Sequence, residues 1–145
     1  MNEHCQIDFY VLEDESLSAE LLACRLALMA WEQGNRIMVL TESREQTEQV
    51  DALMWEHPPG RFLPHAQRRE KSSAPVLIGT LNELADESGE VVINLTNSAL
   101  PRPERFHRLL EPVPADPVRR SASRDKFRAY RTHGLQPSSH AIKRQ

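Results

Sequence analysis

Short apolar runs alternate with helix-length segments along this chain, and this alternation limits its fold more than any other feature. The runs are residues 7–12 (IDFYVL), 37–40 (IMVL), 75–78 (PVLI) and 91–95 (VVINL). Continuously apolar runs of this length are typical of buried strands, and parallel strands need helix-length crossovers between them. With 145 residues in total, we predict a single α/β domain with a mostly parallel sheet flanked by helices.

The first two helices are predicted from apolar spacing and end signals. Ser16 or Ser18 can cap the first helix, and Gly34 stands where a left-handed glycine ends one. Its apolar face has spacings of three and four residues and comprises Leu17, Leu21, Cys24, Leu28 and Trp31. A capping box at residues 43–46 starts the second helix, which we expect to reach about Trp55 and to bury Val50, Leu53 and Met54.

Prolines and polar stretches define the remaining segments. Residues 57–65 (HPPGRFLPH) form a rigid loop, and the basic stretch 67–73 is expected to be a mobile surface loop. Residues 109–113 are predicted as a last strand, at the edge of the sheet because they contain Pro112. Asp116 and Pro117 begin a final helix that runs to about Thr132. We therefore expect one domain over residues 1–135 and a flexible polar tail over 136–145.

Charge is distributed unevenly along the chain. Residues 1–115 hold 10 Lys/Arg and 19 Asp/Glu, a net charge of −9, whereas residues 116–145 hold 8 and 2, a net charge of +6. A basic C-terminal segment on an acidic body indicates a negatively charged partner: nucleic acid, phosphate or an acidic peptide.

The final helix concentrates this positive charge on one stripe. At 100° per residue, four arginines and one aromatic ring lie within 100° of arc: Arg120, Arg124, Phe127, Arg128 and Arg131. Val118, Ala122 and Ala129 fall on the opposite side, where we expect the helix to pack on the sheet. A solvated basic face is the alternative. Binding is favoured because no acid shares the stripe and like charges one turn apart destabilise a helix.

Two large rings occur in and beside the proline-rich loop. Trp55 and Phe62 can either cap the core at a helix end or together wall a small apolar pocket. The residues alone leave both arrangements open.

The sequence lacks the motifs that are typical of several classes of function. The five glycines are too far apart to form a phosphate-binding loop, and the six histidines show no metal-ligand spacing. Residues 13–15 are acidic and are most simply a solvated turn. The sequence shows no membrane-length apolar run and no secretory signal, and its two cysteines suit a reducing cytoplasm. We expect no catalytic residue, cofactor or metal.

The motifs LMWEHPPGRFLPH, APVLI, VVINL and SRDKFRAYRTHG, in this order, resemble the chi subunit family of the bacterial DNA polymerase III holoenzyme. The resemblance covers about residues 7–135. It implies a Rossmann-like sheet without a nucleotide site, and a non-enzymatic accessory of the clamp loader. It also implies two partners, the psi subunit and the acidic, phenylalanine-terminated tail of single-stranded DNA-binding protein, with nucleic acid contacted only indirectly.

The same resemblance implies a site for that tail. Arg124, Arg128 and Arg120 match basic positions, and Phe127 takes a position that is often tyrosine. The apolar positions of that site are matched by Trp55, Phe62 and Val113, so the resemblance implies that Trp55 and Phe62 line a small apolar pocket beside the basic helix. We expect Arg128→Glu to abolish tail binding in a folded protein. The psi-binding residues cannot be placed from the sequence.

Two other functions remain as alternatives. The basic helix could bind nucleic acid directly, although the acidic body would repel a long polyanion. The cleft at the strand ends could hold an enzyme site, which the missing phosphate loop disfavours.

Overall fold

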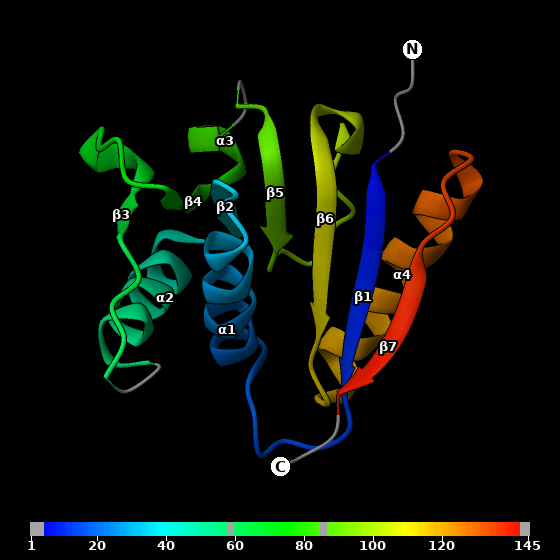
Figure 1. Cartoon of the computed structure of the whole chain (residues 1–145). Coiled ribbons are helices and arrows are strands. Elements are labelled where there is room, and N and C mark those ends of the chain that lie inside the picture. The colour runs from blue at the N-terminus through cyan, green and yellow to red at the C-terminus, as the bar shows by residue number, and fades with distance from the viewer. Residues whose placement is uncertain (1–4, 58–59, 85–86, 143–145) are drawn as a thin grey trace.

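The computed structural model describes residues 5–57, 60–84 and 87–142, and within them one seven-stranded sheet whose neighbouring strands all run parallel (Figure 1). The strand order is β3-β4-β2-β5-β6-β1-β7. The strands are β1 (Gln6–Leu12), β2 (Ile37–Thr41), β3 (His65–Gln67), β4 (Val76–Thr80), β5 (Gly89–Asn94), β6 (Phe106–Val113) and β7 (Ser138–Ile142). The predicted parallel α/β fold is confirmed.

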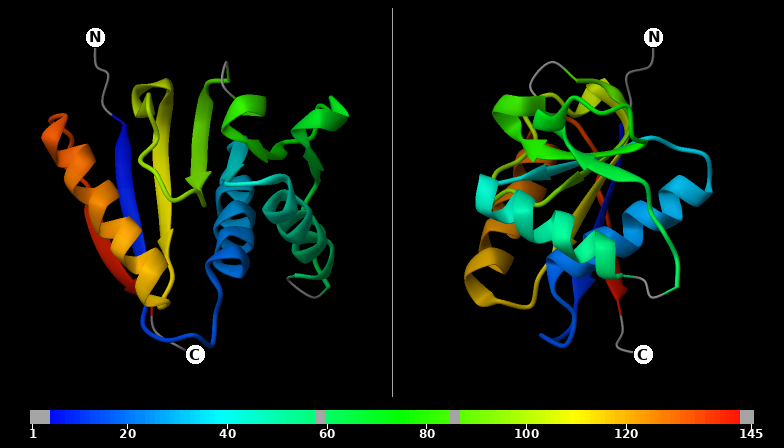
Figure 2. Two further views of the ribbon diagram at one scale, coloured as in Figure 1. Left: turned by 180° about the vertical axis from the view of Figure 1, so that it is seen from behind. Right: turned by 90° about the vertical axis from the view of Figure 1, so that its left-hand side faces the viewer.

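Helices cover both faces of this sheet, as Figure 2 shows. On one face lie α1 (Ala19–Glu32) and α2 (Arg44–Glu56), which pack on one cluster of buried side chains. On the other face lie α3 (Leu81–Leu84) and α4 (Pro117–Thr132), which pack on a second cluster. Short 3-10 turns occur at Arg68–Glu70 and Pro103–Arg105.

The predicted helix ends are present. Ser18, Ser43 and Asp116 each accept a hydrogen bond from the backbone N–H three residues later, at 3.0, 3.1 and 2.9 Å. Gly34 and Gly134 end α1 and α4 with φ of +94° and +84°. The capping box at residues 43–46 is modified, because the Gln46 side chain accepts from the N–H of Glu42 instead of Ser43.

The strand containing Pro112 is not an edge strand. β6 begins at Phe106 and lies between β5 and β1. Its pairing with β5 ends at Leu110, while Pro112 pairs only with Tyr10 of β1. A proline is tolerated here because no β5 residue faces it, so the ladder on that side has already ended.

The polar C-terminal segment forms the true edge strand. β7 pairs in parallel with β1, and the prediction of a loose tail is wrong for Ser138–Ile142; residues 143–145 lie outside the described residues. Nε2 of His140 lies 2.9 Å from Oδ1 of Asp8, and its ring stacks on Tyr10 at 5.3 Å between centroids. Burial acts to raise the pKa of Asp8, but hydrogen bonds from His140 and Arg108 outweigh it and lower the pKa. These contacts anchor a strand whose first three residues are polar and of which only Ile142 packs against a core cluster.

The basic stretch 67–73 is more regular than its composition predicts. Gln67 is buried at the end of β3, and a 3-10 turn follows it. Arg68 pairs with Glu87 and Arg69 with Glu48, each at 2.9 Å. Much of the positive charge of this segment is therefore neutralised by neighbouring carboxylates.

Candidate functional site

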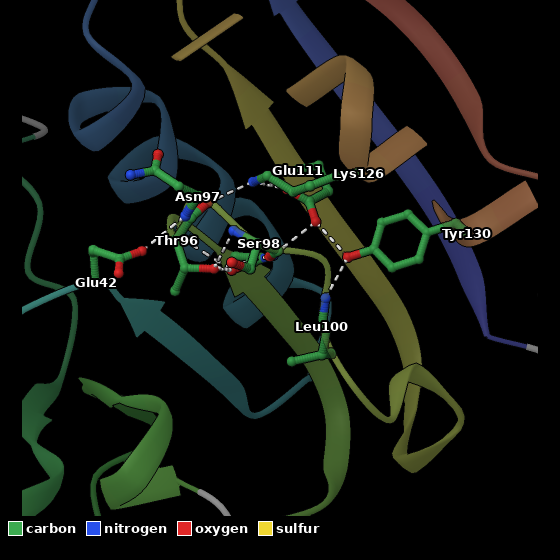
Figure 3. Close-up of polar contacts among 9 residues, drawn as sticks. Glu42, Thr96, Asn97, Ser98, Leu100, Glu111, Lys126 and Tyr130 are labelled. Carbon is green, nitrogen blue, oxygen red and sulfur yellow. Dashed lines mark hydrogen bonds and ion pairs between the residues drawn. The ribbon is translucent and has the colours of Figure 1, made fainter. Parts of the chain in front are cut away.

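A buried polar network docks α4 on the sheet (Figure 3). The carboxylate of Glu111, on β6, is fully buried. Nζ of Lys126 lies 2.7 Å from its Oε1, and the Tyr130 hydroxyl donates to its Oε2 at 2.6 Å. Burial is the main influence that raises the pKa of Tyr130, so its hydroxyl stays protonated and donates to the carboxylate.

The same network holds the segment that follows β5. Lys126 also donates to the Thr96 carbonyl at 2.6 Å, and the Leu100 N–H donates to the Tyr130 hydroxyl at 2.8 Å. Asn94 completes the shell around Glu111 by donating to Oε2 at 2.8 Å. The helix is thus fixed in rotation by hydrogen bonds with defined geometry as well as by apolar packing.

This rotation differs from the predicted one. α4 turns Ser123, Lys126 and Tyr130 inward, and Val118, expected to pack on the sheet, is 78% exposed. Ala122 and Ala129 are only partly buried. The prediction of the packing face is wrong because the buried positions of α4 are mostly polar.

The rotation of α4 leaves a pocket of about 260 Å³ between this helix and strands β1, β6 and β7. Phe9, Val11 and Val113 supply apolar surface from the sheet, and Ser139 belongs to the edge strand. From α4 the lining residues are Arg120, Ser123, Arg124 and Phe127. The pocket therefore combines an apolar floor with two guanidinium groups.

The two arginines differ in how they are held. Arg120 donates to the carbonyls of Leu12 and Pro114, the latter at 3.3 Å, so its charge is fixed beside the pocket. Arg124 is exposed, and its side chain makes no ion pair with any described residue. Phe127 is held by the ring of Phe9, at 5.1 Å between centroids. Arg124 is thus available to an incoming anion.

Arg128 and Arg131 do not line this pocket. Arg128 is 73% exposed and pairs with Asp125 at 2.9 Å, three residues earlier on the same helix. The expectation that no acid accompanies the stripe is therefore wrong at this position. Arg131 is exposed in the last turn of α4, where it adds to the positive field without touching the pocket.

Trp55 and Phe62 lie elsewhere on the molecule. Trp55 lies in the last turn of α2, and Phe62 follows in the loop before β3. Both elements are at the opposite edge of the sheet from α4, and α2 covers the opposite face (Figures 1 and 2). Trp55 and Phe62 are 64% and 59% exposed, and their rings contact each other at 5.6 Å between centroids. The prediction that they wall a pocket beside the basic helix is wrong. They form a separate surface, here called the aromatic patch.

Four pocket residues were missed by the sequence reasoning: Phe9, Val11, Ser123 and Ser139. Phe9 and Val11 alternate along β1, so strand periodicity alone places them on one face. Ser139 carried no comparable signal, because the first three residues of its strand are polar and show no hydrophobic alternation. Val113, Arg120, Arg124 and Phe127 were predicted and do lie together.

This geometry suits an anionic ligand with an apolar group. Guanidinium groups bind carboxylates through charge-assisted hydrogen bonds, and the floor can bury a side chain. Among the described residues, no three His, Cys, Asp or Glu side chains are grouped to hold a metal ion. No helix in the described part of the chain is long and apolar enough to cross a membrane.

Comparison with known proteins gives consistent matches. A family model described as "DNA polymerase III chi subunit, HolC" matches residues 5–138. A "DNA polymerase III subunit chi" of Pseudomonas aeruginosa is 36% identical over 140 residues, covering 96% of this chain and 98% of that protein. Proteins of the same description from Escherichia coli and Haemophilus influenzae are 28% and 26% identical, over 88% and 92% of this chain and 91% and 95% of their own lengths.

Proposed function

This chain belongs to the DNA polymerase III chi subunit family, and from that premise we propose that it links two components of the replication machinery. One is the clamp-loader complex, contacted through psi, and the other is the acidic C-terminal tail of single-stranded DNA-binding protein. The observation that carries the proposal is the pocket under α4, where Arg120 and Arg124 stand beside an apolar floor.

The proposed ligand matches the pocket group by group. A phenylalanine-terminated acidic tail presents an aromatic ring, an α-carboxylate and nearby acidic side chains within a few residues. The ring fits against Val113 and Phe127, and Arg120 and Arg124 are placed to receive the carboxylates. Arg128 and Arg131 extend the positive surface toward the more distant acidic residues of the tail.

The proposed role is non-catalytic and requires no cofactor or metal. The protein would act in the bacterial cytoplasm and meet nucleic acid only through the tail-bearing protein. The net charge of −9 on residues 1–115 supports a short acidic peptide over a long polyanion as ligand, since a polyanion would also meet the acidic body.

A titration separates these two ligands. We expect a peptide of the last few tail residues to saturate the protein at a single site, and its affinity to gain little from lengthening. Single-stranded DNA of matched charge should bind far more weakly. DNA affinity that exceeds peptide affinity, grows with oligonucleotide length and falls steeply with salt would contradict the proposal in favour of direct nucleic-acid binding.

The aromatic patch supplies a candidate surface for the second partner. A linking protein must hold both partners at once, which favours surfaces far apart, and Trp55 and Phe62 are separated from α4 by the width of the sheet (Figure 1). Exposed, clustered aromatic rings are typical anchors of protein interfaces. We therefore propose that psi binds at the aromatic patch and that these rings do not contact the tail.

Phe62→Ser is expected to separate the two interactions. Because Phe62 is 59% exposed, the substitution should leave the fold intact, weaken co-purification with psi at least about ten-fold, and leave tail-peptide affinity unchanged. Val118→Ser, at an apolar side chain that is 78% exposed on α4, is the matched control and should retain psi. Loss of tail binding in Phe62→Ser, with psi retained, would contradict this assignment.

A further inference from the structure

The helical cover on the α3–α4 face of the sheet is incomplete. α3 has only four residues and contacts β4 and β2, whereas α4 lies over β6 and β1 (Figure 2). Between them is a hollow of about 280 Å³. Its apolar walls are formed by Met38, Leu40, Leu84, Val92, Leu100 and Phe106. We call this hollow the central groove. None of these residues lines the pocket under α4.

The central groove continues into a second hollow. That hollow measures about 180 Å³ and shares Leu40, Leu81, Asn82, Leu100 and Pro101 with the first. It leads to the carboxyl ends of β2 and β4, where Thr41 and Thr80 line it. The combined cavity is apolar in the central groove and polar in the second hollow, where Glu42 also lines it and accepts a hydrogen bond from the N–H of Asn97 at 2.9 Å. Two adjoining hollows of different polarity can receive successive side chains of one peptide segment.

The charge beside the apolar end is positive. Arg102 and Arg105 line the central groove, and the exposed side chain of Arg102 makes no hydrogen bond or ion pair with any described residue. The carboxylate among the lining residues, Glu87, is already paired with Arg68 at 2.9 Å. An acidic group that enters the central groove can therefore pair with the guanidinium of Arg102. A basic group has no such partner there, because Glu87 is already paired with Arg68.

We propose that the central groove is a second peptide-docking site, which takes an internal, extended segment of a partner protein. A bulky apolar side chain of that segment fills the hollow over β2 and β5, and an adjacent acidic side chain pairs with Arg102. The ligand class differs from that of the pocket under α4 in one chemical respect: no free terminal carboxylate is needed.

A blocked peptide tests this site without engaging the other. The probe is the hexapeptide Gly-Asp-Leu-Phe-Asp-Gly, acetylated and amidated so that it has no terminal charges. In two-dimensional NMR of the full chain, we expect its titration to shift the backbone amides of Met38, Leu84 and Val92, and not that of Val113. Shifts confined to the surroundings of Val113, or no shifts at millimolar peptide, would overturn the proposal.

Substitutions at the mouth of the groove provide the second readout. Arg102→Glu should weaken hexapeptide binding at least about ten-fold, and Leu81→Glu, at an exposed wall residue, should do the same by placing a charge in the apolar end. Arg25→Glu, an exposed position on α1, is the charge-matched control and should bind normally. Equal weakening by Arg25→Glu and Arg102→Glu would show a non-specific charge effect and overturn the site.

Two further experiments test the ligand class and distinguish this site from the proposed tail site. Acetylphenylalanine, followed at the amides of Met38, Leu84 and Val92 so that binding in the pocket under α4 is not counted, should bind the groove at least about ten-fold more weakly than the hexapeptide; equal affinity at these amides would overturn a peptide ligand in favour of a small carboxylate. Arg124→Glu should leave hexapeptide binding unchanged, because Arg124 lies outside the groove. Loss of hexapeptide binding in Arg124→Glu would place the hexapeptide in the pocket under α4 and overturn the proposal.

Discussion

Arg124→Glu is expected to reduce affinity for the tail peptide by about 100-fold or more while leaving the fold intact. Arg124 lines the pocket under α4, is exposed, and makes no ion pair with a described residue that would have to be broken before it binds a carboxylate. A charge-assisted hydrogen bond contributes about 1.5–3 kcal/mol, and about 1.4 kcal/mol corresponds to ten-fold in affinity. Replacement by glutamate also adds repulsion against the carboxylates of the tail.

Arg128→Glu is the matched comparison on the same helix. Arg128 lies outside the pocket and is paired with Asp125, so its replacement should weaken the peptide only several-fold. The measurement is peptide titration by calorimetry at moderate salt, with circular dichroism to verify the fold of each variant. Near-wild-type affinity in folded Arg124→Glu would reject the pocket as the tail site.

This ranking of the two arginines revises the expectation from helix spacing. Both residues lie on the basic stripe, and helix spacing does not rank one above the other. From spacing and the family match, Arg128→Glu is expected to abolish tail binding. The structure distinguishes them, because the rotation of α4 directs Arg124 toward the pocket and leaves Arg128 beside Asp125.

Most of the fold follows from local features of the sequence. The apolar runs that became β2, β4 and β5 are buried on both faces of a parallel sheet, so they read as continuous rather than alternating hydrophobic segments. The ends of the long helices follow from Ser18, Ser43, Asp116 and the glycines, whose side-chain or backbone geometry acts within one turn.

The features that were missed depend on contacts distant in sequence. β7 has little hydrophobic pattern and is anchored by backbone pairing with β1 and by the His140–Asp8 contact, 132 residues apart. Likewise, β6 was predicted at the edge of the sheet because it contains Pro112. It can lie inside the sheet because its pairing with β5 ends at Leu110, before Pro112. Pattern analysis reads neighbouring residues, so it cannot recognise a strand whose support lies in another part of the chain.

Only part of the candidate site was predicted, because the remaining part also depends on contacts between residues distant in sequence. Helix periodicity brought Arg120, Arg124 and Phe127 together correctly, because all three lie on one regular element. Trp55 and Phe62 were assigned to the same pocket because they are two rings in a proline-rich loop and match apolar positions of the family, but the sheet separates them from α4. The packing face of α4 was also missed, since Ser123 and Lys126 are polar and their burial depends on Glu111.

Lys126→Met is expected to lower the free energy of unfolding by about 3–5 kcal/mol, because it leaves a buried carboxylate without its cation. Glu111 is fully buried, and Lys126 supplies its only positive partner among the described residues. Domains of this size are stable by about 5–15 kcal/mol, so the loss is a large fraction of the total. Urea denaturation, with Arg128→Met as an exposed control on the same helix, measures it; the control should change stability by less than about 0.5 kcal/mol.

The origin of this loss can be tested with a second substitution. Adding Glu111→Gln to Lys126→Met removes the uncompensated charge and keeps an oxygen to accept from Tyr130, so the double variant should be more stable than Lys126→Met alone. Burial already raises the pKa of Glu111, and without the lysine it rises further. The folded single variant then binds a proton that the unfolded chain lacks at neutral pH, so its deficit should shrink as the pH is lowered toward 5. A double variant that is no more stable than Lys126→Met, or a deficit that is constant with pH, would show that Lys126 stabilises α4 through its packing and not through the charge on Glu111.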